Sequence, residues 1–222
     1  MQRTILIIVA LVAIVGGGWW MFSDRAAPGG QAGAETAQPA DAADIDTSGI
    51  VDMQMGNPDA AVTVIEYASF TCPHCATFNA SVFPQLKANY IDTGKINFIH
   101  REVYFDRYAL WAGMVARCGG PERYFGIADM IYTQQQQWLA GTDPLAISAG
   151  LQRIGRTAGL SDEEVTACLN DGATAQAMVA VYEANAAADD VRATPSFVIN
   201  GEKHSNMSYA AFAEILDKEL GE

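Results

Sequence analysis

A pair of cysteines separated by two residues, between a short apolar strand and a helix, is the feature that most constrains this chain. Residues 61–68 are rich in β-branched and aromatic side chains and predict a buried strand. Residues 72–75 read Cys-Pro-His-Cys, and a helical pattern runs over 72–91, in which Pro84 predicts a kink or interruption. Residues 95–102 predict a second strand. This order favours two parallel strands joined by a right-handed crossover.

The residues after the second predicted strand change to helical spacing, and glycines separate the segments. Helices are expected over residues 108–118, 124–139, 144–158, 162–170 and 173–188. Strand character returns at residues 195–199, after which Asn200-Gly201 predicts a tight hairpin turn to a strand near Lys203. An amphipathic helix is expected over residues 209–220. The chain therefore predicts an α/β fold interrupted by a helical block.

The position of the cysteine pair predicts redox chemistry. Cys72 lies where the helix is expected to begin, so unpaired N–H groups and the helix dipole favour its thiolate. A charged imidazole at His74, next to Pro73, would add a positive charge. Both effects lower the pKa of Cys72 and stabilise the reduced form, which makes the disulfide a strong oxidant. Cys72 is the expected exposed sulfur, and Cys75, one turn deeper, the resolving one.

A single Cys-x-x-Cys motif has other uses. A zinc ribbon needs a second such pair, whereas Cys118 and Cys168 stand singly. A c-type haem attachment needs His directly after the second cysteine, and Ala76 occupies that position. A purely structural disulfide remains an alternative. The strand before the pair and the helix after it favour the redox interpretation, in which the sulfurs carry the electrons. No metal and no bound cofactor are therefore predicted.

Two distant features agree with that interpretation. Glu66 lies inside the apolar strand; facing the core it would have a raised pKa and could relay a proton to a leaving thiolate. Facing solvent, it would be an ordinary strand residue. Pro195 opens a strand, which needs no special cause. A cis Thr194–Pro195 bond, however, would turn the Thr194 backbone toward the cysteines, where it could pair with a bound peptide strand.

Taken together, these segments resemble the DsbA-like thiol:disulfide oxidoreductases of the bacterial cell envelope. The likeness depends on Val-Ile-Glu-Tyr-Ala-Ser-Phe-Thr-Cys-Pro-His-Cys (64–75), on the helical block, and on Thr-Pro-Ser-Phe-Val-Ile-Asn-Gly (194–201). It implies a thioredoxin fold with an inserted all-helical domain. Residues 50–103 and 189–222 would form the thioredoxin fold, and residues 104–188 the insertion.

The resemblance also implies roles for individual residues. Cys72 and Cys75 would be the redox pair, and Glu66 the buried acid six residues before them. The Pro-His dipeptide between the cysteines is the one typical of oxidases in this family. Thr194 and Pro195 would form the cis-proline loop.

A protein of this kind would introduce disulfide bonds into reduced, unfolded exported proteins and would be reoxidised by a DsbB-like membrane quinone reductase. One alternative is a periplasmic isomerase or reductase kept reduced by a membrane electron donor. Thr194, where the family's oxidases have Val, also occurs in isomerase-type relatives, although those usually carry an N-terminal dimerisation module in place of a linker. A third hypothesis is a non-enzymatic holdase or scaffold that binds unfolded chains in an apolar groove.

The N-terminus predicts export. Residues 4–22 form a nearly unbroken apolar run after Arg3, long enough for a membrane anchor, while residues 5–15 suit the core of a cleaved signal peptide. A buried N-terminal helix is the remaining alternative. Residues 1–22 are therefore expected to be a signal peptide or anchor, followed by a flexible linker rich in Ala, Gly and Pro over residues 23–49. The expected location is the periplasm, with an inner-membrane tether if the leader stays uncleaved.

Charge excludes one class of partner. Thirteen Lys and Arg residues stand against 26 Asp and Glu, which gives a formal net charge of −13. Nucleic-acid binding needs a surplus of clustered basic residues, so no nucleic-acid partner is predicted.

The remaining polar motifs receive structural interpretations. In an oxidising compartment Cys118 and Cys168 are expected to pair, with two separate buried thiols as the alternative. His100 and His204 have no partner pattern nearby and are assigned no role. The run Gln134–Gln137 is expected to be the solvent-facing side of a helix.

Overall fold

The computed structural model describes residues 45–222. The predicted anchor or signal peptide at residues 1–22, and nearly all of the predicted linker at 23–49, lie outside the described residues. Within residues 45–222, no helix combines the length and the apolar character that crossing a membrane requires.

A mixed sheet forms the centre of the described chain, with strand order β1-β3-β2-β4-β5. The predicted parallel pairing of β2 and β3 is confirmed, and the other neighbouring strands pair antiparallel. The strands are β1 (Met53–Gly56), β2 (Val62–Ala68), β3 (Ile96–Glu102), β4 (Ser196–Ile199) and β5 (Glu202–Ser205).

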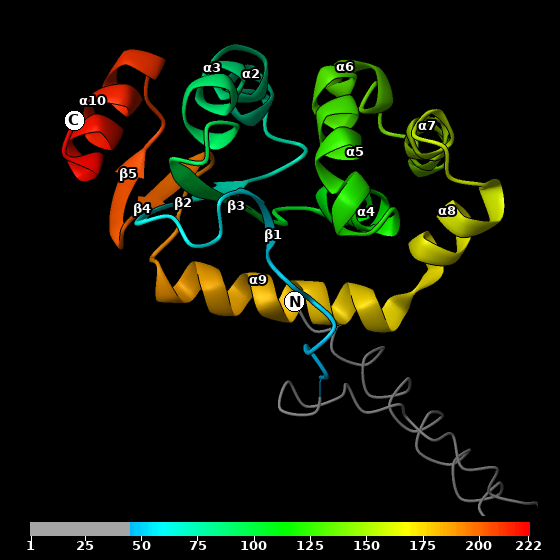
Figure 1. The fold of residues 1–222 in the computed structure, drawn as a ribbon. Helices are drawn as coiled ribbons and strands as arrows, with labels where there is room; N and C mark the ends of the chain where they lie inside the picture. The colour runs from blue at the N-terminus through cyan, green and yellow to red at the C-terminus, as the bar shows by residue number, and fades with distance from the viewer. Residues whose placement is uncertain (1–44) are drawn as a thin grey trace, which may run out of the picture. The chain divides into compact units, whose positions relative to one another are not determined.

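Helices cover both faces of the sheet and extend beyond one side of it (Figure 1). One face is covered by α9, the other by α2, α3 and α10, while α4 to α8 form a helical block between β3 and α9 in the sequence. The α/β fold with an all-helical insertion is therefore observed. The helices are α2 (Pro73–Ser81), α3 (Phe83–Leu86), the π-helical turn η2 (Lys87–Ile91), α4 (Arg107–Cys118), α5 (Pro121–Thr133), α6 (Gln135–Trp138), α7 (Pro144–Thr157), α8 (Asp162–Asn170), α9 (Gly172–Ala188) and α10 (Tyr209–Leu220).

Local sequence signals account for several boundaries. The long helix expected over 72–91 is interrupted at Val82, just before Pro84, because a proline inside a helix lacks the N–H that the preceding turn needs. The predicted hairpin turn is confirmed: Asn200 and Gly201 have φ values of 47° and 88°, the left-handed pair that a tight two-residue turn requires.

Two features differ from the sequence-based expectation. Strand β1 is not predicted by the sequence, and it pairs antiparallel with β3, with Met53 opposite His100. The helix expected over 124–139 is divided into α5 and α6, because Gln134 leaves helical geometry at φ −100°, ψ 13°.

The alternation along β2 sends successive side chains to opposite layers. Val62 and Val64 pack with the aromatic core under α2, α3 and α10, whereas Tyr67 packs on the α9 side. Glu66 shares the face of Val64, so the fold places this carboxyl on the side of the sheet that carries α2.

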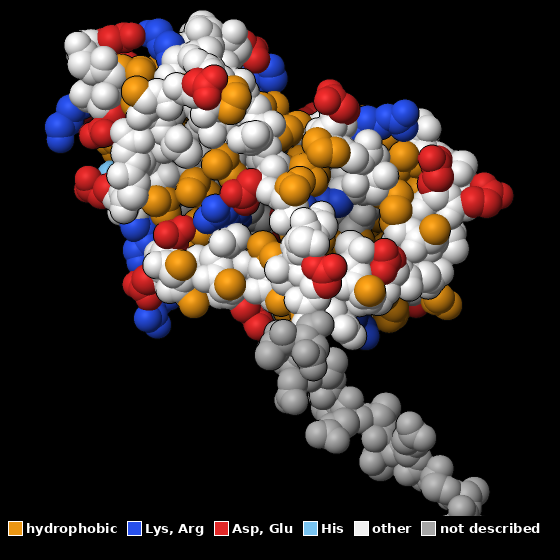
Figure 2. Space-filling model, turned by 60° about the horizontal axis from the view of Figure 1, so that its bottom comes forward, with side chains coloured by type: hydrophobic (Ala, Val, Ile, Leu, Met, Phe, Trp, Pro, Cys, Tyr) orange, Lys and Arg blue, Asp and Glu red, His pale blue; other side chains and the backbone are white. Residues whose placement is uncertain are grey.

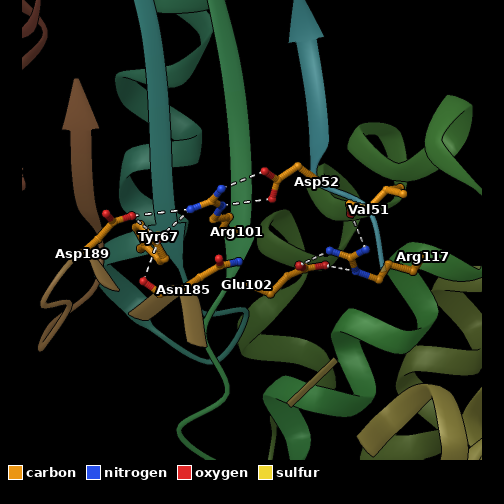
Figure 3. Close-up of polar contacts among 8 residues, drawn as sticks. All are labelled: Val51, Asp52, Tyr67, Arg101, Glu102, Arg117, Asn185 and Asp189. Carbon is orange, nitrogen blue, oxygen red and sulfur yellow. Dashed lines mark hydrogen bonds and ion pairs between the residues drawn. The ribbon is translucent and has the colours of Figure 1, made fainter. Parts of the chain in front are cut away.

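Polar contacts hold the chain before β1 against the sheet (Figure 3). Arg101 on β3 lies between Asp52 and Tyr67, with its Nη2 2.8 Å from an Asp52 carboxylate oxygen and its Nη1 2.9 Å from the Tyr67 hydroxyl. The Tyr67 hydroxyl also donates to Asp189, which caps the end of α9.

Seen from the α9 side, hydrophobic side chains are interspersed with acidic and basic ones (Figure 2).

Candidate active site

The loop after β2 positions the first cysteine at the start of α2. Cys72 is the N-cap residue of α2, with an extended backbone at φ −82°, ψ 119°, and Pro73 follows as the first helical residue. The Cys72 N–H donates to the Ser69 carbonyl at 3.1 Å. On the other side of the loop, the Thr71 hydroxyl donates to Asp106, the N-cap of α4, at 2.8 Å. Both contacts fix the direction in which the chain enters the helix.

The two thiols have very different surroundings. Cys72 is partly exposed, whereas Cys75 is buried, with 1% of its surface exposed. The hydrogen bond from Cys75, followed by the Thr194 side chain and the backbone N–H groups of Cys75 and His74, lowers the pKa of Cys72 to about 5. The pKa of Cys75 is raised far above its usual value, because it gives that hydrogen bond to Cys72, is buried and lies near Glu66. At neutral pH the pair is therefore a thiolate beside a protonated thiol.

His74 contributes through its backbone. Its side chain is exposed, and the contact with Cys72 that stabilises the thiolate comes from the His74 main-chain N–H. The helix N-terminus thus adds to the larger stabilisation of the thiolate that comes from the Cys75 thiol and the Thr194 side chain.

The loop before β4 lies against the same sulfur. The Thr194–Pro195 peptide bond is cis, which is one of the two possibilities that the sequence left open for Pro195. The Thr194 carbonyl is 3.4 Å from the Cys72 Sγ. The structure thus brings Thr194 and Cys72, which are 122 residues apart in the sequence, into direct contact.

The carboxyl of Glu66 lies beneath the pair. Glu66 is buried, with 5% exposed, and its burial raises the pKa to about 8. It also adds to the rise in the pKa of Cys75, which indicates that the two groups are close enough to interact electrostatically. The core-facing alternative for Glu66 is therefore the one observed, and the group is largely protonated at neutral pH.

His100 lies next to Glu66 in the parallel pair, at the register position directly opposite on β3. Its ring is bracketed by two tyrosines of α5: Nδ1 is 2.7 Å from the Tyr124 hydroxyl and Nε2 is 3.3 Å from the Tyr132 hydroxyl. Burial lowers the pKa of His100 to about 4, so the ring is neutral at physiological pH. The sequence assigned this residue no role; the structure shows it joining the sheet to the helical block.

Gln135 is the residue of this region that sequence reasoning placed wrongly. The run Gln134–Gln137 was expected to face solvent, yet Gln135 is buried and its Nε2 donates to the carbonyls of Phe70 at 2.8 Å and Cys72 at 3.0 Å. A signal was present. Gln135 follows Ile131 by four residues and precedes Trp138 by three, and both are buried, so it lies on the apolar stripe of the helical pattern.

The other two cysteines form a disulfide that joins the end of α4 to α8. Cys118 and Cys168 have Cα atoms 5.9 Å apart and are bonded through their sulfurs. This bridge lies within the helical block. It is separate from the pair at the start of α2, in which both cysteines are free thiols.

A family model described as Thioredoxin matches residues 48–218 of the chain. Among curated proteins, the chain is 36% identical over 172 residues to a Rickettsia bellii protein named as a candidate protein-disulfide oxidoreductase, and 37% identical over 172 residues to its Rickettsia conorii counterpart. Each match covers 77% of this chain. The chain spans 65% and 61% of the length of these two relatives.

Solved structures show the same fold. The crystal structure of Wolbachia pipientis alpha-DsbA1 matches with a TM-score of 0.70 and 31% identity, over 77% of this chain and 91% of that chain. Oxidised BdbD from Bacillus subtilis matches with a TM-score of 0.68 over 77% of this chain and 94% of that chain, but its 21% identity supports the fold alone. These matches agree with a thioredoxin fold that carries a helical insertion.

Proposed function

Because this chain belongs to the DsbA-like branch of the thioredoxin family, we propose that it is a thiol:disulfide oxidoreductase that introduces disulfide bonds into exported proteins through Cys72 and Cys75. One observation carries the proposal: an accessible cysteine of low pKa stands next to a buried cysteine of high pKa. Such a pair is stabilised when reduced, so its disulfide readily accepts two electrons.

The first step is attack on the oxidised pair. A substrate thiolate bonds to the Cys72 sulfur, the Cys72–Cys75 bond breaks, and Cys75 leaves with the electron pair. Because the pKa of Cys75 is high, its thiolate takes up a proton at once. Glu66, whose pKa is about 8, is a protonated acid close to that sulfur and supplies the proton.

The second step releases the product. Another substrate thiolate attacks the substrate sulfur of the mixed disulfide, a substrate disulfide forms, and Cys72 leaves as a thiolate. A thiol with a pKa of about 5 is a good leaving group, so this step favours release. The Thr194 backbone, beside the Cys72 sulfur, is positioned to pair with the bound substrate strand.

Turnover requires reoxidation of the dithiol. We assign this to a DsbB-like membrane quinone reductase, and the substrates are reduced, unfolded proteins exported to the periplasm. The apolar segment at residues 4–22 supports an exported location. The sulfurs carry the electrons, so the exchange itself uses no bound cofactor.

Oxidation of reduced ribonuclease A by the purified, oxidised domain tests the proposal, with recovered nuclease activity as the readout. The Cys72→Ser variant is expected to lose the activity. The double variant Cys118→Ser/Cys168→Ser is the matched control, and it is expected to keep the activity when assayed well below its unfolding temperature. Full activity of Cys72→Ser would refute the assignment. A Cys72–Cys75 pair found mostly as the dithiol in cells would instead indicate an isomerase or reductase.

A further inference from the structure

We propose that Gln135 is a positioning residue for Cys72, through which the helical block sets the acidity of the reactive thiol. The proposal deepens the function proposed above and rests on it. Gln135 belongs to α6, outside the strand–loop–helix unit that carries the cysteines. Its side-chain amide nevertheless reaches two main-chain carbonyls of that unit, those of Phe70 and Cys72.

The orientation of the amide follows from its partners. Phe70 and Cys72 both present carbonyl oxygens, which only accept hydrogen bonds, so the NH2 end of Gln135 must face them. Both of its hydrogens are then used, at donor–acceptor distances of 2.8 and 3.0 Å. The positive end of the amide dipole therefore points at the backbone of the reactive cysteine.

Contacts with α5 and α7 fix the position of α6. The Trp138 indole N–H donates to the Ile131 carbonyl at 2.8 Å, which ties α6 back onto α5. Gly150 of α7 packs so closely on Trp138 that a Cβ added there would lie 2.9 Å from the Trp138 Cβ. Gln135 is thus held by the helical block and is not a mobile surface side chain.

The Cys72 carbonyl also accepts the N–H of Ala76 at 3.2 Å, in the first turn of α2. Holding this oxygen holds the extended N-cap backbone of Cys72, which keeps the sulfur at the N-terminus of α2, near the main-chain N–H groups of His74 and Cys75. Loss of the amide would loosen that geometry and remove a nearby positive dipole. Both changes disfavour the thiolate, so they raise the pKa of Cys72.

The titratable residues around Cys72 are the same in the wild type and in each Gln135 variant. They are Cys75 and His74 on α2, Glu66 on β2 and Tyr132 on α5, and Asp106 before α4 is bonded to the neighbouring Thr71. A shift in the titration of Cys72 can then be assigned to the lost amide contacts.

The exposed neighbour Gln136 provides a matched control for substitutions of the buried Gln135. Gln135→Met removes the amide at nearly constant volume, and Gln135→Asn keeps an amide that is one methylene too short to reach both carbonyls. Gln136→Met makes the first of these changes on an exposed neighbour. For each full-length reduced protein, the thiolate absorbance is titrated against pH, and the equilibrium with glutathione is measured.

Gln135→Met is expected to lower the acid dissociation constant of Cys72 about tenfold, the size of one lost hydrogen bond to a charge-stabilising backbone. The same variant is expected to shift the glutathione equilibrium about tenfold toward the disulfide, since the reduced form loses stabilisation. Gln135→Asn is expected to give a smaller change in the same direction, and Gln136→Met no change.

An unchanged Cys72 titration in Gln135→Met, whatever its thermal stability, would overturn the proposal, and so would an equal shift in Gln136→Met. If Gln135→Met does not fold, the Gln135→Asn titration decides the question in the same way. These measurements need no substrate protein. Failure to oxidise ribonuclease A would therefore refute the proposed function while leaving this inference to stand or fall on the titration.

Discussion

Glu66 occupies a strand position whose neighbours on the same face are apolar, and its burial raises the pKa to about 8. In the unfolded chain the same carboxyl ionises near 4.5. Above pH 4.5 the unfolded state therefore loses this proton first, so Glu66 increasingly destabilises the fold until the native group also ionises near pH 8. The protein tolerates this because a protonated acid beside Cys75 serves the exchange reaction proposed above.

Replacement of Glu66 by Gln is expected to stabilise the protein and to slow its chemistry. The amide cannot ionise, so the free energy of unfolding should rise by about 2–3 kcal/mol at pH 7, with little gain at pH 4. Release of Cys75 should become slower, because the proton source is lost. Urea unfolding at several pH values and stopped-flow reduction of the disulfide measure the two effects. An increase in the free energy of unfolding that is the same at every pH would contradict the conclusion that ionisation of Glu66 causes the effect.

At the scale of single residues, the sequence predicted those whose roles depend on their immediate neighbours in the chain. Cys72 and Glu66 follow from a helix start and from a strand interior, which are patterns of a few residues. Gln135 and His100 do not, because their partners lie on other elements. The buried position of Gln135 was open to inference from helical spacing, but its two carbonyl acceptors were not.

At the scale of elements, a buried ion pair links the sheet to the helical block. Arg117 of α4 contacts both carboxylate oxygens of Glu102 at the end of β3, at 2.7 and 2.6 Å, and donates to the Val51 carbonyl at 2.9 Å (Figure 3). The side chains are only 13% and 3% exposed. A pair this deeply buried leaves a costly charge behind if one partner is removed.

Substitution of Arg117 by Met should therefore lower the free energy of unfolding by about 3–5 kcal/mol. Adding Glu102→Gln should recover part of the loss, because the unpaired charge is gone. Arg156→Met is the control: its pair with Asp162 is 45% and 65% exposed, so its removal should change stability by less than about 1 kcal/mol. Urea denaturation measures all three. Equal losses at Arg117 and Arg156 would show that burial of the pair is immaterial.

The elements themselves were predicted where the local signal is strong. Pro84 and Asn200-Gly201 mark a break and a turn through backbone constraints that act within a few residues. Strand β1 gave no such signal, since Met-Gln-Met-Gly has no β-branched residue and becomes a strand only by pairing with β3. The division between α5 and α6 was missed because Gln134 is a normal helix former.

At the scale of the whole molecule, the Cys118–Cys168 bridge closes a loop whose ends are 50 residues apart and which contains most of the helical block. Cross-linking the unfolded chain over such a loop lowers its entropy and stabilises the fold by about 4 kcal/mol. The pair at Cys72 and Cys75 spans too few residues for a comparable effect. The Cys118–Cys168 disulfide thus stabilises the fold, whereas Cys72 and Cys75 carry the proposed redox chemistry.

The double variant Cys118→Ser/Cys168→Ser is expected to unfold with about 4 kcal/mol less free energy than the wild type under non-reducing conditions. The double variant Cys72→Ser/Cys75→Ser should show no loss of that size. Chemical denaturation of the two proteins side by side makes the comparison. A small loss in the first variant would mean that the bridge constrains a segment already ordered in the unfolded state.

The contacts of Asp52 with Arg101, and of Val51 with Arg117, have a mechanical consequence. A force applied to the chain before Val51 would first load these two contacts and the short pairing of β1 with β3. Arg101 projects to the opposite side of the sheet from Glu66 and His100, since neighbouring strand positions alternate. The Arg101 contact therefore lies on the far side of the sheet from Glu66 and Cys75, so a load that reaches it through Asp52 is borne away from the reactive sulfurs.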